Sequence, residues 1–530
     1  MSIETFDRIL WVVLDGFGHE HARRLLDVPG RFPALERVAR DGYLGACRPP
    51  GPVCQTPPAL LALFSGTEPA ENGVWGYKVP DAGGRLERSI SGFSVARRGG
   101  RAIWEDLEDR GLTFSLMNVS FRQDRVWSSP FRHLAFAYDG YRCLRPPVHL
   151  EGLGAGGSTS LEYRGMEFSF TRRDGRSVLR KGNRMLAGLE VGEGVPVAFS
   201  RGTRAFAHQL SRDVLSLYPE SPALVRLGPG ASRVLSPPPG AESSRDLSAF
   251  RKARAANGSG DPRRRVTVES ELLPARVALR QKADLMLWTA RTHPSALSIC
   301  YVPLIDEFNH TYFDLIEGPS PDPRASELLE KCWGLVDAFL ADLMRLADPG
   351  TLLVLSSDHG ALPFRRLLHL NELFADEGLV QRDGRGYDLG RSAVYYHPSD
   401  CGQVVVNGPE GGRRRLGRPT LLAAARAVVE RANDSYGAHI GAIEGGPSDP
   451  YLLYLYPLAD AYFTGNPCSP GRPPMNCGKA GGHHLSPLTP NPWIEAVLGL
   501  WSPRPGPRDG DGVPLCNTGV KEFLLGRLAS

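Results

Sequence analysis

The sequence lacks the features that mark a membrane-spanning or exported protein. No apolar run approaches the roughly 20 residues that a helix needs to span a bilayer. The N-terminus is acidic before a short apolar run and offers no small-residue cleavage site, so it makes a poor signal peptide. We therefore expect a cytoplasmic protein with no membrane partner.

Paired cysteines and a strong net charge are lacking too. The nine cysteines are odd in number, scattered, and form no C-x-x-C pair, which predicts mostly reduced thiols. The net charge is only +4 in 530 residues, too weak to indicate a nucleic-acid groove, so no nucleic-acid polymer is expected as a partner. The 42% hydrophobic and 23% charged residues are typical of a soluble globular protein.

Three short apolar segments predict buried parallel strands, because each is apolar throughout and polar at its carboxyl end. They are residues 8–14, 296–304 and 351–355. Helical patterns lie between and around them, at residues 33–41, 57–65, 101–110, 323–347 and 421–432. This alternation favours an α/β fold with a doubly wound, mostly parallel sheet. In such sheets the functional groups collect at the carboxyl ends of the strands.

The α/β core is expected in three parts, residues 1–125, 271–365 and 476–530, separated by two inserts. The first insert, residues 126–270, is rich in Gly, Ser, Pro and Arg with short alternating stretches, which predicts a β-containing cap. The second, residues 366–475, is irregular. We expect substrate specificity to lie in these inserts. The sequence does not indicate an oligomeric state.

Aspartate and histidine gather at the predicted strand ends and in one later motif. Together they are the ligand types that zinc prefers, with manganese as the alternative. Alone, each Asp has a simpler explanation as a turn or cap residue, but their joint occurrence indicates a metal site. The candidates are Asp15, Asp306, His310, Asp358, His359 and the pair His483-His484.

A nucleophile candidate lies between the first two strand ends. The segment from Gln55 predicts a helix start with Thr56 as N-cap and Pro57 in the first helical position. A helix N-terminus favours an anion such as phosphate. A metal beside the Thr56 hydroxyl would lower its pKa and activate it as a nucleophile. The simpler alternative is that Thr56 only caps the helix.

Taken in order, these motifs resemble the alkaline phosphatase superfamily, and most closely its type I phosphodiesterase/nucleotide pyrophosphatase branch. The second motif matches the family spacing at Thr56, Pro58, Gly66, Pro69 and Gly73. The motifs are V-V-L-D-G at 12–16, T-P-P-A-L-L-A-L-F-S-G-T-E-P-A-E-N-G at 56–73, I-D-E-F-N-H at 305–310, S-D-H-G at 357–360 and G-G-H-H-L-S-P at 481–487.

The resemblance implies an alkaline-phosphatase-like core with two divalent metal ions, expected to be zinc. One ion would be held by Asp15, Asp358 and His359, with Thr56 close to it. The other would be held by Asp306, His310 and a C-terminal histidine, for which the family spacing to Pro487 favours His483 over His484. The implied reaction forms a phosphothreonine on Thr56, which a metal-bound water then hydrolyses.

Two departures from the family pattern concern the substrate. Where the family has a phosphate-binding asparagine, this sequence has Trp75-Gly76-Tyr77, so Tyr77 is the expected donor. Trp75 and Tyr77 are the candidate substrate contacts, with packing in the core as the alternative. The family often has an aromatic residue after the nucleophile, and Pro57 at that position weakens the case for a nucleotide.

The expected activity is hydrolysis of a small-molecule phosphate ester, with a phosphodiesterase favoured. A phosphomonoesterase and a phosphonate hydrolase of the same superfamily remain open alternatives. A catalytically inactive member that binds a partner is the non-enzyme alternative. Such a member should lack ligands, whereas this sequence offers a candidate for all six and for the nucleophile.

Overall fold

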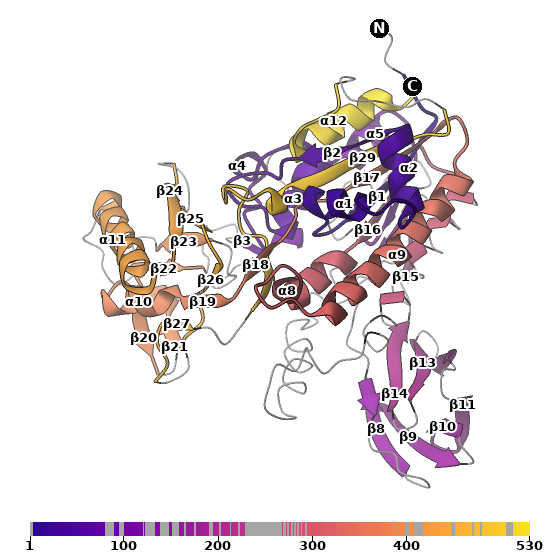
Figure 1. The fold of residues 1–530 in the computed structure, drawn as a ribbon, viewed down its shortest axis with the longest axis horizontal. Coiled ribbons are helices and arrows are strands. Elements are labelled where there is room, and N and C mark those ends of the chain that lie inside the picture. The colour runs from indigo at the N-terminus through magenta and orange to yellow at the C-terminus, as the bar shows by residue number, and fades with distance from the viewer. Residues whose placement is uncertain are drawn as a thin grey trace.

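The structure is a computed structural model in which the chain forms three groups of elements (Figure 1). A central sheet with its helices lies between the strands β8–β14 on one side and the elements α10, α11 and β19–β27 on another. Among the described residues, no helix is both long and apolar enough to cross a bilayer. The structure describes residues 4–79, 90–94, 100–119 and 121. Between 133 and 291 it describes the strands, the turn at 182–183 and scattered helical residues. It then describes residues 294–384, 386–397, 402–407, 417–446, 451–468, 471–476, 480–504 and 512–529.

The central sheet has eight strands in the order β15-β6-β5-β16-β1-β17-β29-β2. All run in one direction except β15 and β29, so the predicted mostly parallel sheet is confirmed. The strands are β1 (Arg8–Leu14), β2 (Tyr43–Cys47), β5 (Phe114–Met117), β6 (His133–Ala137), β15 (Ala223–Leu227), β16 (Leu297–Val302), β17 (Thr351–Ser356) and β29 (Ala496–Trp501).

Helices cover both faces of the sheet. The residues of β1 show this, since they alternate between two apolar clusters. Leu10, Val12 and Leu14 pack in the cluster that includes α2, α8 and α9. Ile9, Trp11 and Val13 pack in the cluster that includes α3, α5 and α12. The predicted doubly wound α/β fold is therefore confirmed. These helices are α2 (Pro33–Asp41), α3 (Thr56–Ser65), α5 (Ile103–Asp109), α8 (Leu304–Ile316), α9 (Pro323–Leu346) and α12 (Asn517–Arg527).

The register of the three central strands brings their carboxyl ends to one level. Leu14 at the end of β1 pairs with Val302 at the end of β16. Val13 pairs with Ser356 at the end of β17. The side chains that follow these strands therefore meet at a single edge of the sheet.

The expected cap, residues 126–270, contains β structure in its described part. Two antiparallel four-stranded sheets have the orders β11-β10-β9-β8 and β12-β13-β14-β7. However, β6 and β15 lie inside the same range and extend the edge of the central sheet. The exact limits of the cap stay a prediction. The strands are β7 (Val148–Leu150), β8 (Ser158–Tyr163), β9 (Met166–Arg173), β10 (Arg176–Lys181), β11 (Arg184–Leu189), β12 (Gly194–Ser200), β13 (Thr203–Ser211) and β14 (Val214–Glu220).

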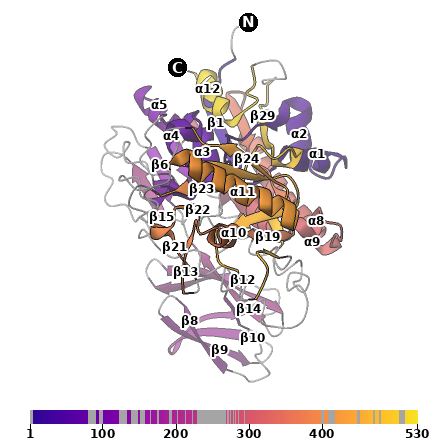
Figure 2. The same cartoon turned by 90° about the vertical axis from the view of Figure 1, so that its left-hand side faces the viewer.

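The second insert forms an α/β unit, here called the second unit, from described residues between 366 and 476. Its four-stranded sheet, β22-β23-β25-β24, packs with α10 and α11 around its own apolar cluster. Figure 2 shows α11 in front of these strands. The main elements are β19 (Arg366–His369), α10 (Leu370–Asp376), β22 (Val394–Tyr396), β23 (Gln403–Val406), α11 (Arg418–Tyr436), β24 (Ile440–Glu444), β25 (Tyr451–Pro457), β26 (Ala461–Thr464) and β27 (Met475–Asn476).

One helix of the core is capped by a side chain from another. The buried carboxylate of Asp337, on α9, accepts hydrogen bonds from Leu35 N at 2.9 Å and Ala34 N at 3.3 Å, in the first turn of α2. We expect Asp337→Ala to lower the free energy of unfolding by about 1–2 kcal/mol, because two helix donors lose their acceptor. Glu327→Ala removes an exposed ion pair from the same helix and should change it by less than about 1 kcal/mol. Urea unfolding of both variants tests this; equal effects would contradict the capping role.

Candidate active site

The carboxyl ends of β1, β16 and β17 bring three buried aspartates to one edge of the sheet. Asp15 directly follows β1, Asp358 lies just beyond β17, and Asp306 lies in the first turn of α8, shortly after β16. The backbone N–H of Asp306 donates to the carbonyl of Asp15 at 3.0 Å, which holds two of these segments side by side. The structure therefore brings together the strand-end residues that the sequence predicted to lie close.

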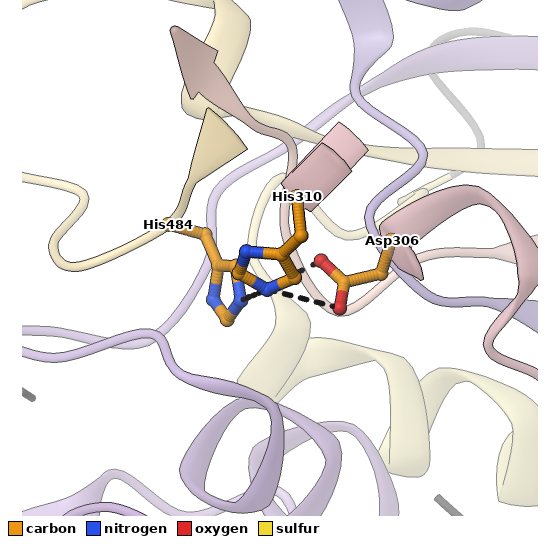
Figure 3. A group of neighbouring side chains, drawn as sticks. All are labelled: Asp306, His310 and His484. Atoms are coloured by element: carbon orange, nitrogen blue, oxygen red, sulfur yellow. Dashed lines mark hydrogen bonds and ion pairs between the residues drawn. The ribbon is translucent and has the colours of Figure 1, made fainter. Parts of the chain in front are cut away.

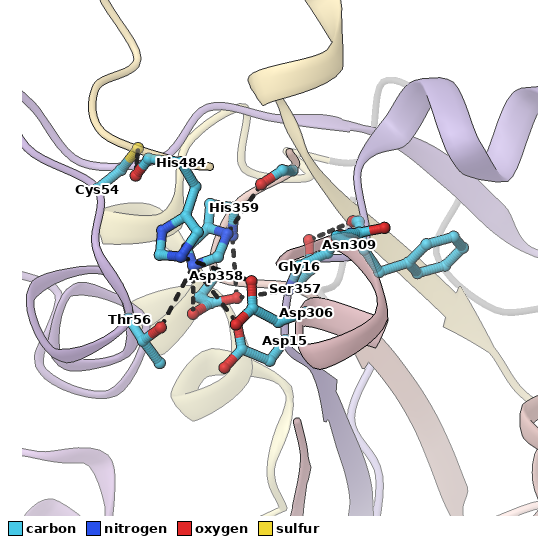
Figure 4. A network of polar contacts seen from close by, with 12 residues as sticks. Asp15, Gly16, Cys54, Thr56, Asp306, Asn309, Ser357, Asp358, His359 and His484 are labelled. Atoms are coloured by element: carbon cyan, nitrogen blue, oxygen red, sulfur yellow. Dashed lines mark hydrogen bonds and ion pairs between the residues drawn. The ribbon is translucent and has the colours of Figure 1, made fainter. Parts of the chain in front are cut away.

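The first cluster consists of Asp15, Asp358 and His359 (Figure 4). His359 Nε2 lies 3.2 Å from Asp358 Oδ2 and 3.4 Å from Asp15 Oδ1. All three side chains are fully buried. Three ligand atoms of the types that zinc prefers thus face one point.

The second cluster consists of Asp306, His310 and His484 (Figure 3). His310 Nε2 lies 3.2 Å from Asp306 Oδ2 and 3.1 Å from His484 Nε2. His484 Nε2 lies 3.5 Å from Asp306 Oδ1. The His484 ring also stacks on the ring of His359, with 3.6 Å between their centroids, so the two clusters are adjacent.

At the C-terminal histidine the structure differs from the prediction. His484 lies in the second cluster, whereas the motif spacing favoured His483. His483 is the last residue of β28 (Gly481–His483), and successive side chains of an extended chain point to opposite sides. Its ring packs beside Tyr462 and Phe364, at centroid distances of 5.3 and 6.0 Å. His484 therefore replaces His483 among the candidate ligands.

The backbone fixes the orientation of two of the three imidazoles. His359 Nδ1 lies 2.9 Å from the carbonyl of Gly360, and His310 Nδ1 lies 2.9 Å from the carbonyl of Gly482. A carbonyl only accepts hydrogen bonds, so each Nδ1 carries the proton. In the neutral ring, Nε2 then keeps a lone pair that faces its cluster, which is the form that binds a metal ion.

Burial and mutual repulsion set the charges of the three aspartates. Burial raises the pKa of Asp15, and the nearby Asp358 carboxyl raises it further. Burial is also the main reason that the pKa of Asp358 is raised. For Asp306 the effect of burial is outweighed by His310 and His484, so its pKa is lowered. Burial, and then His359, hold the pKa of His484 well below its usual range. The site is therefore short of positive charge.

The unsatisfied atoms and the spacings fit two divalent cations. Asp15 Oδ1, Asp358 Oδ2 and Asp306 Oδ1 are buried and have no hydrogen-bond partner among the described residues. Tetrahedral zinc with ligand bonds of about 2.0–2.2 Å places its ligand atoms about 3.3 Å apart. Within each cluster the closest contacts measure 3.1–3.5 Å. Both clusters can thus hold a metal ion of this type.

Supporting residues that the sequence analysis missed hold the ligands in place. The hydroxyl of Tyr301, on β16, donates to Asp15 Oδ2. Asn309 Nδ2, on α8, donates to the carbonyl of Gly16 at 2.8 Å, and Asn517 Nδ2, on α12, donates to the carbonyl of Asp358 at 2.7 Å. None of these residues belongs to a pattern that sequence spacing can recognise, although Asn309 stands inside the D-E-F-N-H motif.

Two glycines allow the segments that carry ligands to approach. Gly16 has a φ of +71°, and a Cβ there would lie 2.8 Å from the Cα of Asp306. A Cβ on Gly482 would lie 2.5 Å from the carbonyl oxygen of Asn309, on α8. Both distances are too short for a side chain. Gly16 therefore lets the segment after β1 approach Asp306, and Gly482 lets the segment that carries His484 approach α8.

Thr56 is placed beside the first cluster, at the start of α3. Its Oγ1 lies 3.5 Å from His359 Nε2, and the residue is fully buried. Thr56 is the first helical residue rather than the predicted N-cap, which is Gln55. Pro57 and Pro58 follow, and proline has no N–H to offer an anion. The predicted phosphate site at this helix start is thus poorer in backbone donors than a typical one.

The two aromatic residues proposed as substrate contacts behave differently. The hydroxyl of Tyr77 donates to Thr56 Oγ1 at 2.9 Å, so this side chain reaches the candidate nucleophile. Trp75 is only 8% exposed and stacks on Tyr454, with ring centroids 5.5 Å apart. Trp75 therefore packs in the core of the second unit, and we assign it no direct contact with a substrate.

Comparison with known proteins agrees with this arrangement. The sequence model of the type I phosphodiesterase / nucleotide pyrophosphatase family matches residues 223–412, which include ligands of both clusters. Over these residues the chain is similar to that family. The resemblance inferred from the motifs is confirmed, and it is to a phosphodiesterase-type hydrolase family of the alkaline phosphatase superfamily. No curated protein matches this chain.

Solved structures with a similar fold include phosphonoacetate hydrolase from Sinorhizobium meliloti 1021 in complex with phosphonoacetate. It is 13% identical with a TM-score of 0.50, and the match covers 100% of both chains. Murine ectonucleotide pyrophosphatase / phosphodiesterase 5 is 11% identical with a TM-score of 0.46, covering 98% of this chain and 95% of that one. The likeness to the hydrolase agrees with the α/β fold expected of the family.

The placement of the C-terminal histidine predicts the metal content of two neighbouring variants. After zinc loading and desalting, we expect His484→Ala to fall from about two metal ions per chain to about one, because the second cluster loses a ligand. His483→Ala should keep about two. This order reverses the one that the motif spacing predicts.

Further variants serve as controls for the division into clusters. Asp306→Asn and His310→Ala should behave as His484→Ala does, and Asp15→Asn, Asp358→Asn and His359→Ala should weaken the other ion. Inductively coupled plasma mass spectrometry measures the content. A larger loss from His483→Ala than from His484→Ala would contradict the assignment.

Proposed function

We propose that this chain is a metal-dependent hydrolase of phosphoric esters, most readily diesters, with Thr56 as its nucleophile. The observation that carries the proposal is the position of Thr56 Oγ1. It lies 2.9 Å from the hydroxyl of Tyr77 and 3.5 Å from His359 Nε2, at the edge of six candidate Asp and His ligands, five of them buried. A degenerate member of the family should have lost part of this set.

The metal ions would be held by the two clusters, Asp15, Asp358 and His359 in one, and Asp306, His310 and His484 in the other. We favour zinc, with manganese as the alternative, because the donors are imidazole nitrogens and carboxylate oxygens. When bound, the two ions would supply positive charge for the attacking and leaving oxygens of an in-line displacement.

The reaction would proceed in two steps through Thr56. In the first, Thr56 Oγ1 gives its proton to water and forms a bond to phosphorus, while the bond to the leaving oxygen breaks and that oxygen takes up a proton from water. In the second, a water forms the new bond to phosphorus and Thr56 Oγ1 leaves, which restores the hydroxyl. A covalent intermediate of this kind replaces one difficult step by two easier ones.

Tyr77 has a role in both steps because it donates to the reacting oxygen. A hydrogen bond to the ionised form of a hydroxyl favours that form, so Tyr77 stabilises the Thr56 alkoxide before attack. The same bond stabilises the negative charge that returns to Oγ1 in the second step. Pro57 and Pro58 offer no N–H groups at this helix start, which makes the phenol more important.

The charge around the site favours a substrate with a single negative charge. In the part of the chain that the structure describes, no Lys or Arg side chain forms a hydrogen bond or ion pair with Thr56, Asp15, Asp306, Asp358, His359 or His484. A phosphomonoester dianion needs a further cation beyond two metal ions. A diester carries one negative charge, so it suits a site without a further Lys or Arg better than a monoester does.

Replacement of Thr56 tests the nucleophile. We expect Thr56→Ala to lose hydrolysis by several orders of magnitude, because the covalent route is removed. The zinc content and the fold should survive, at a cost of about 1 kcal/mol for the hydrogen bond from Tyr77. Thr56→Ser keeps a hydroxyl and should retain measurable turnover. Near-normal rates in the Ala variant would remove Thr56 from this role.

A direct comparison of substrates tests the class of ester. On one zinc-loaded preparation, kcat/KM for bis-p-nitrophenyl phosphate should exceed that for p-nitrophenyl phosphate. Phosphonoacetate is included as a third substrate, because phosphonate hydrolysis was the other alternative within the superfamily. A clear preference for the monoester or the phosphonate would overturn the diesterase assignment and leave the two-metal hydrolase standing.

A further inference from the structure

The segment that carries Tyr77 joins the nucleophile to the second unit. It runs from Val74 to β3 (Lys78–Val79), which pairs with β4 (Ile90–Ser91). Directly before β3, the hydroxyl of Tyr77 reaches Thr56 Oγ1. Two residues earlier, Trp75 enters the apolar cluster of the second unit. A contact far from the metal clusters can therefore affect where the Tyr77 hydroxyl lies.

The ring of Trp75 is held by two aromatic residues of β25. It stacks on Tyr454 at a centroid distance of 5.5 Å with 26° between the ring planes. It also packs edge-on against Tyr451, at 5.7 Å and 71°. Aromatic pairs in these geometries contribute beyond their buried area. The side chain of Trp75 is thereby fixed on the second unit.

The backbone of Trp75 is held by a side chain from the neighbouring strand. Gln403, on β23, is fully buried, and its Nε2 donates to the carbonyl oxygen of Trp75 at 2.6 Å. Gln403 pairs in register with Tyr454, so the two residues that grip Trp75 lie on one rung of the sheet. The ring and the backbone carbonyl of Trp75 are thus held by two residues that are paired across the sheet.

We propose that Gln403 is a positioning residue, which acts through the Trp75 backbone to hold the Tyr77 hydroxyl on Thr56. The inference rests on the proposed function, because Tyr77 assists the reaction only if Thr56 is the nucleophile. It gives the second insert a role in hydrolysis itself, in addition to the substrate specificity expected for it. Gln403 touches neither the nucleophile nor the metal ligands in the contacts described, so its effect is indirect.

The test combines a structure with a double-mutant cycle. Gln403→Met keeps the approximate size of the side chain but cannot donate to Trp75. In the crystal structure of the zinc-loaded variant, we expect the Tyr77 hydroxyl to lie beyond hydrogen-bond distance of Thr56 Oγ1. Gln381→Met, at an exposed position of β20 (Gln381–Asp383) in the same unit, is the matched control and should leave both structure and rate unchanged.

The kinetic cycle asks whether Gln403 acts through Tyr77. We expect kcat/KM for bis-p-nitrophenyl phosphate to fall on the order of 100-fold in Tyr77→Phe and about tenfold in Gln403→Met. The double variant should be no slower than Tyr77→Phe alone, because the group that Gln403 positions is already gone. If Gln403→Met does not fold, Trp75→Leu takes its place in both measurements, since it removes the ring that stacks on Tyr454.

The outcomes separate this inference from the proposed function. A Tyr77 hydroxyl that stays on Thr56 in the Gln403 variant overturns the inference whatever the activity. Multiplying losses in the double variant also overturn it and assign Gln403 a purely structural role, with the hydrolase intact. The Tyr77 hydroxyl could be displaced in the Gln403 variant while the wild type hydrolyses no monoester, diester or phosphonate. That result would support the positioning role of Gln403 and reject the proposed function.

Discussion

The whole arrangement depends on three aspartates that are buried together without enough positive charge. Asp15, Asp306 and Asp358 are each at most 2% exposed, and within the described chain the only basic side chains that pair with them are histidines. Buried carboxylates are costly unless they are paired or bind metal ions. Divalent cations remove this cost, so metal binding and the stability of the site are linked. The supporting hydrogen bonds serve to hold the carboxylates close in spite of their repulsion.

The fold meets this constraint by delivering the ligands from rigid elements. The aligned ends of β1, β16 and β17 set the three aspartates, and close contacts through Gly16 and Gly482 bring α8 and β28 against them. The proposed nucleophile, Thr56, is held in another way. Thr56 begins a helix whose next two residues are prolines, and its hydrogen-bond donor comes from a segment fixed on the second unit. The second insert thus contacts the segment that reaches Thr56, and on our proposal it supports the chemistry.

Much of the core and most of the site could be predicted from the sequence. The strand ends are visible locally, since an apolar run followed by Asp predicts both the strand and the ligand. The spacing of Asp306 and His310 similarly places both on one helix face. The structure favours His484 over His483 as the candidate ligand, a choice that local spacing cannot make because adjacent residues differ in the side of the chain they face. Trp75 could not be placed, because its partners Gln403 and Tyr454 are distant in sequence.

The central claim is that the six residues of the two clusters hold two metal ions beside Thr56. Anomalous diffraction from crystals of the zinc-loaded protein, collected at the zinc absorption edge, tests it most directly. The account predicts two peaks about 4 Å apart, one bounded by Asp15, Asp358 and His359 and the other by Asp306, His310 and His484. A single peak, or peaks coordinated by His483 or by residues outside these clusters, would contradict it.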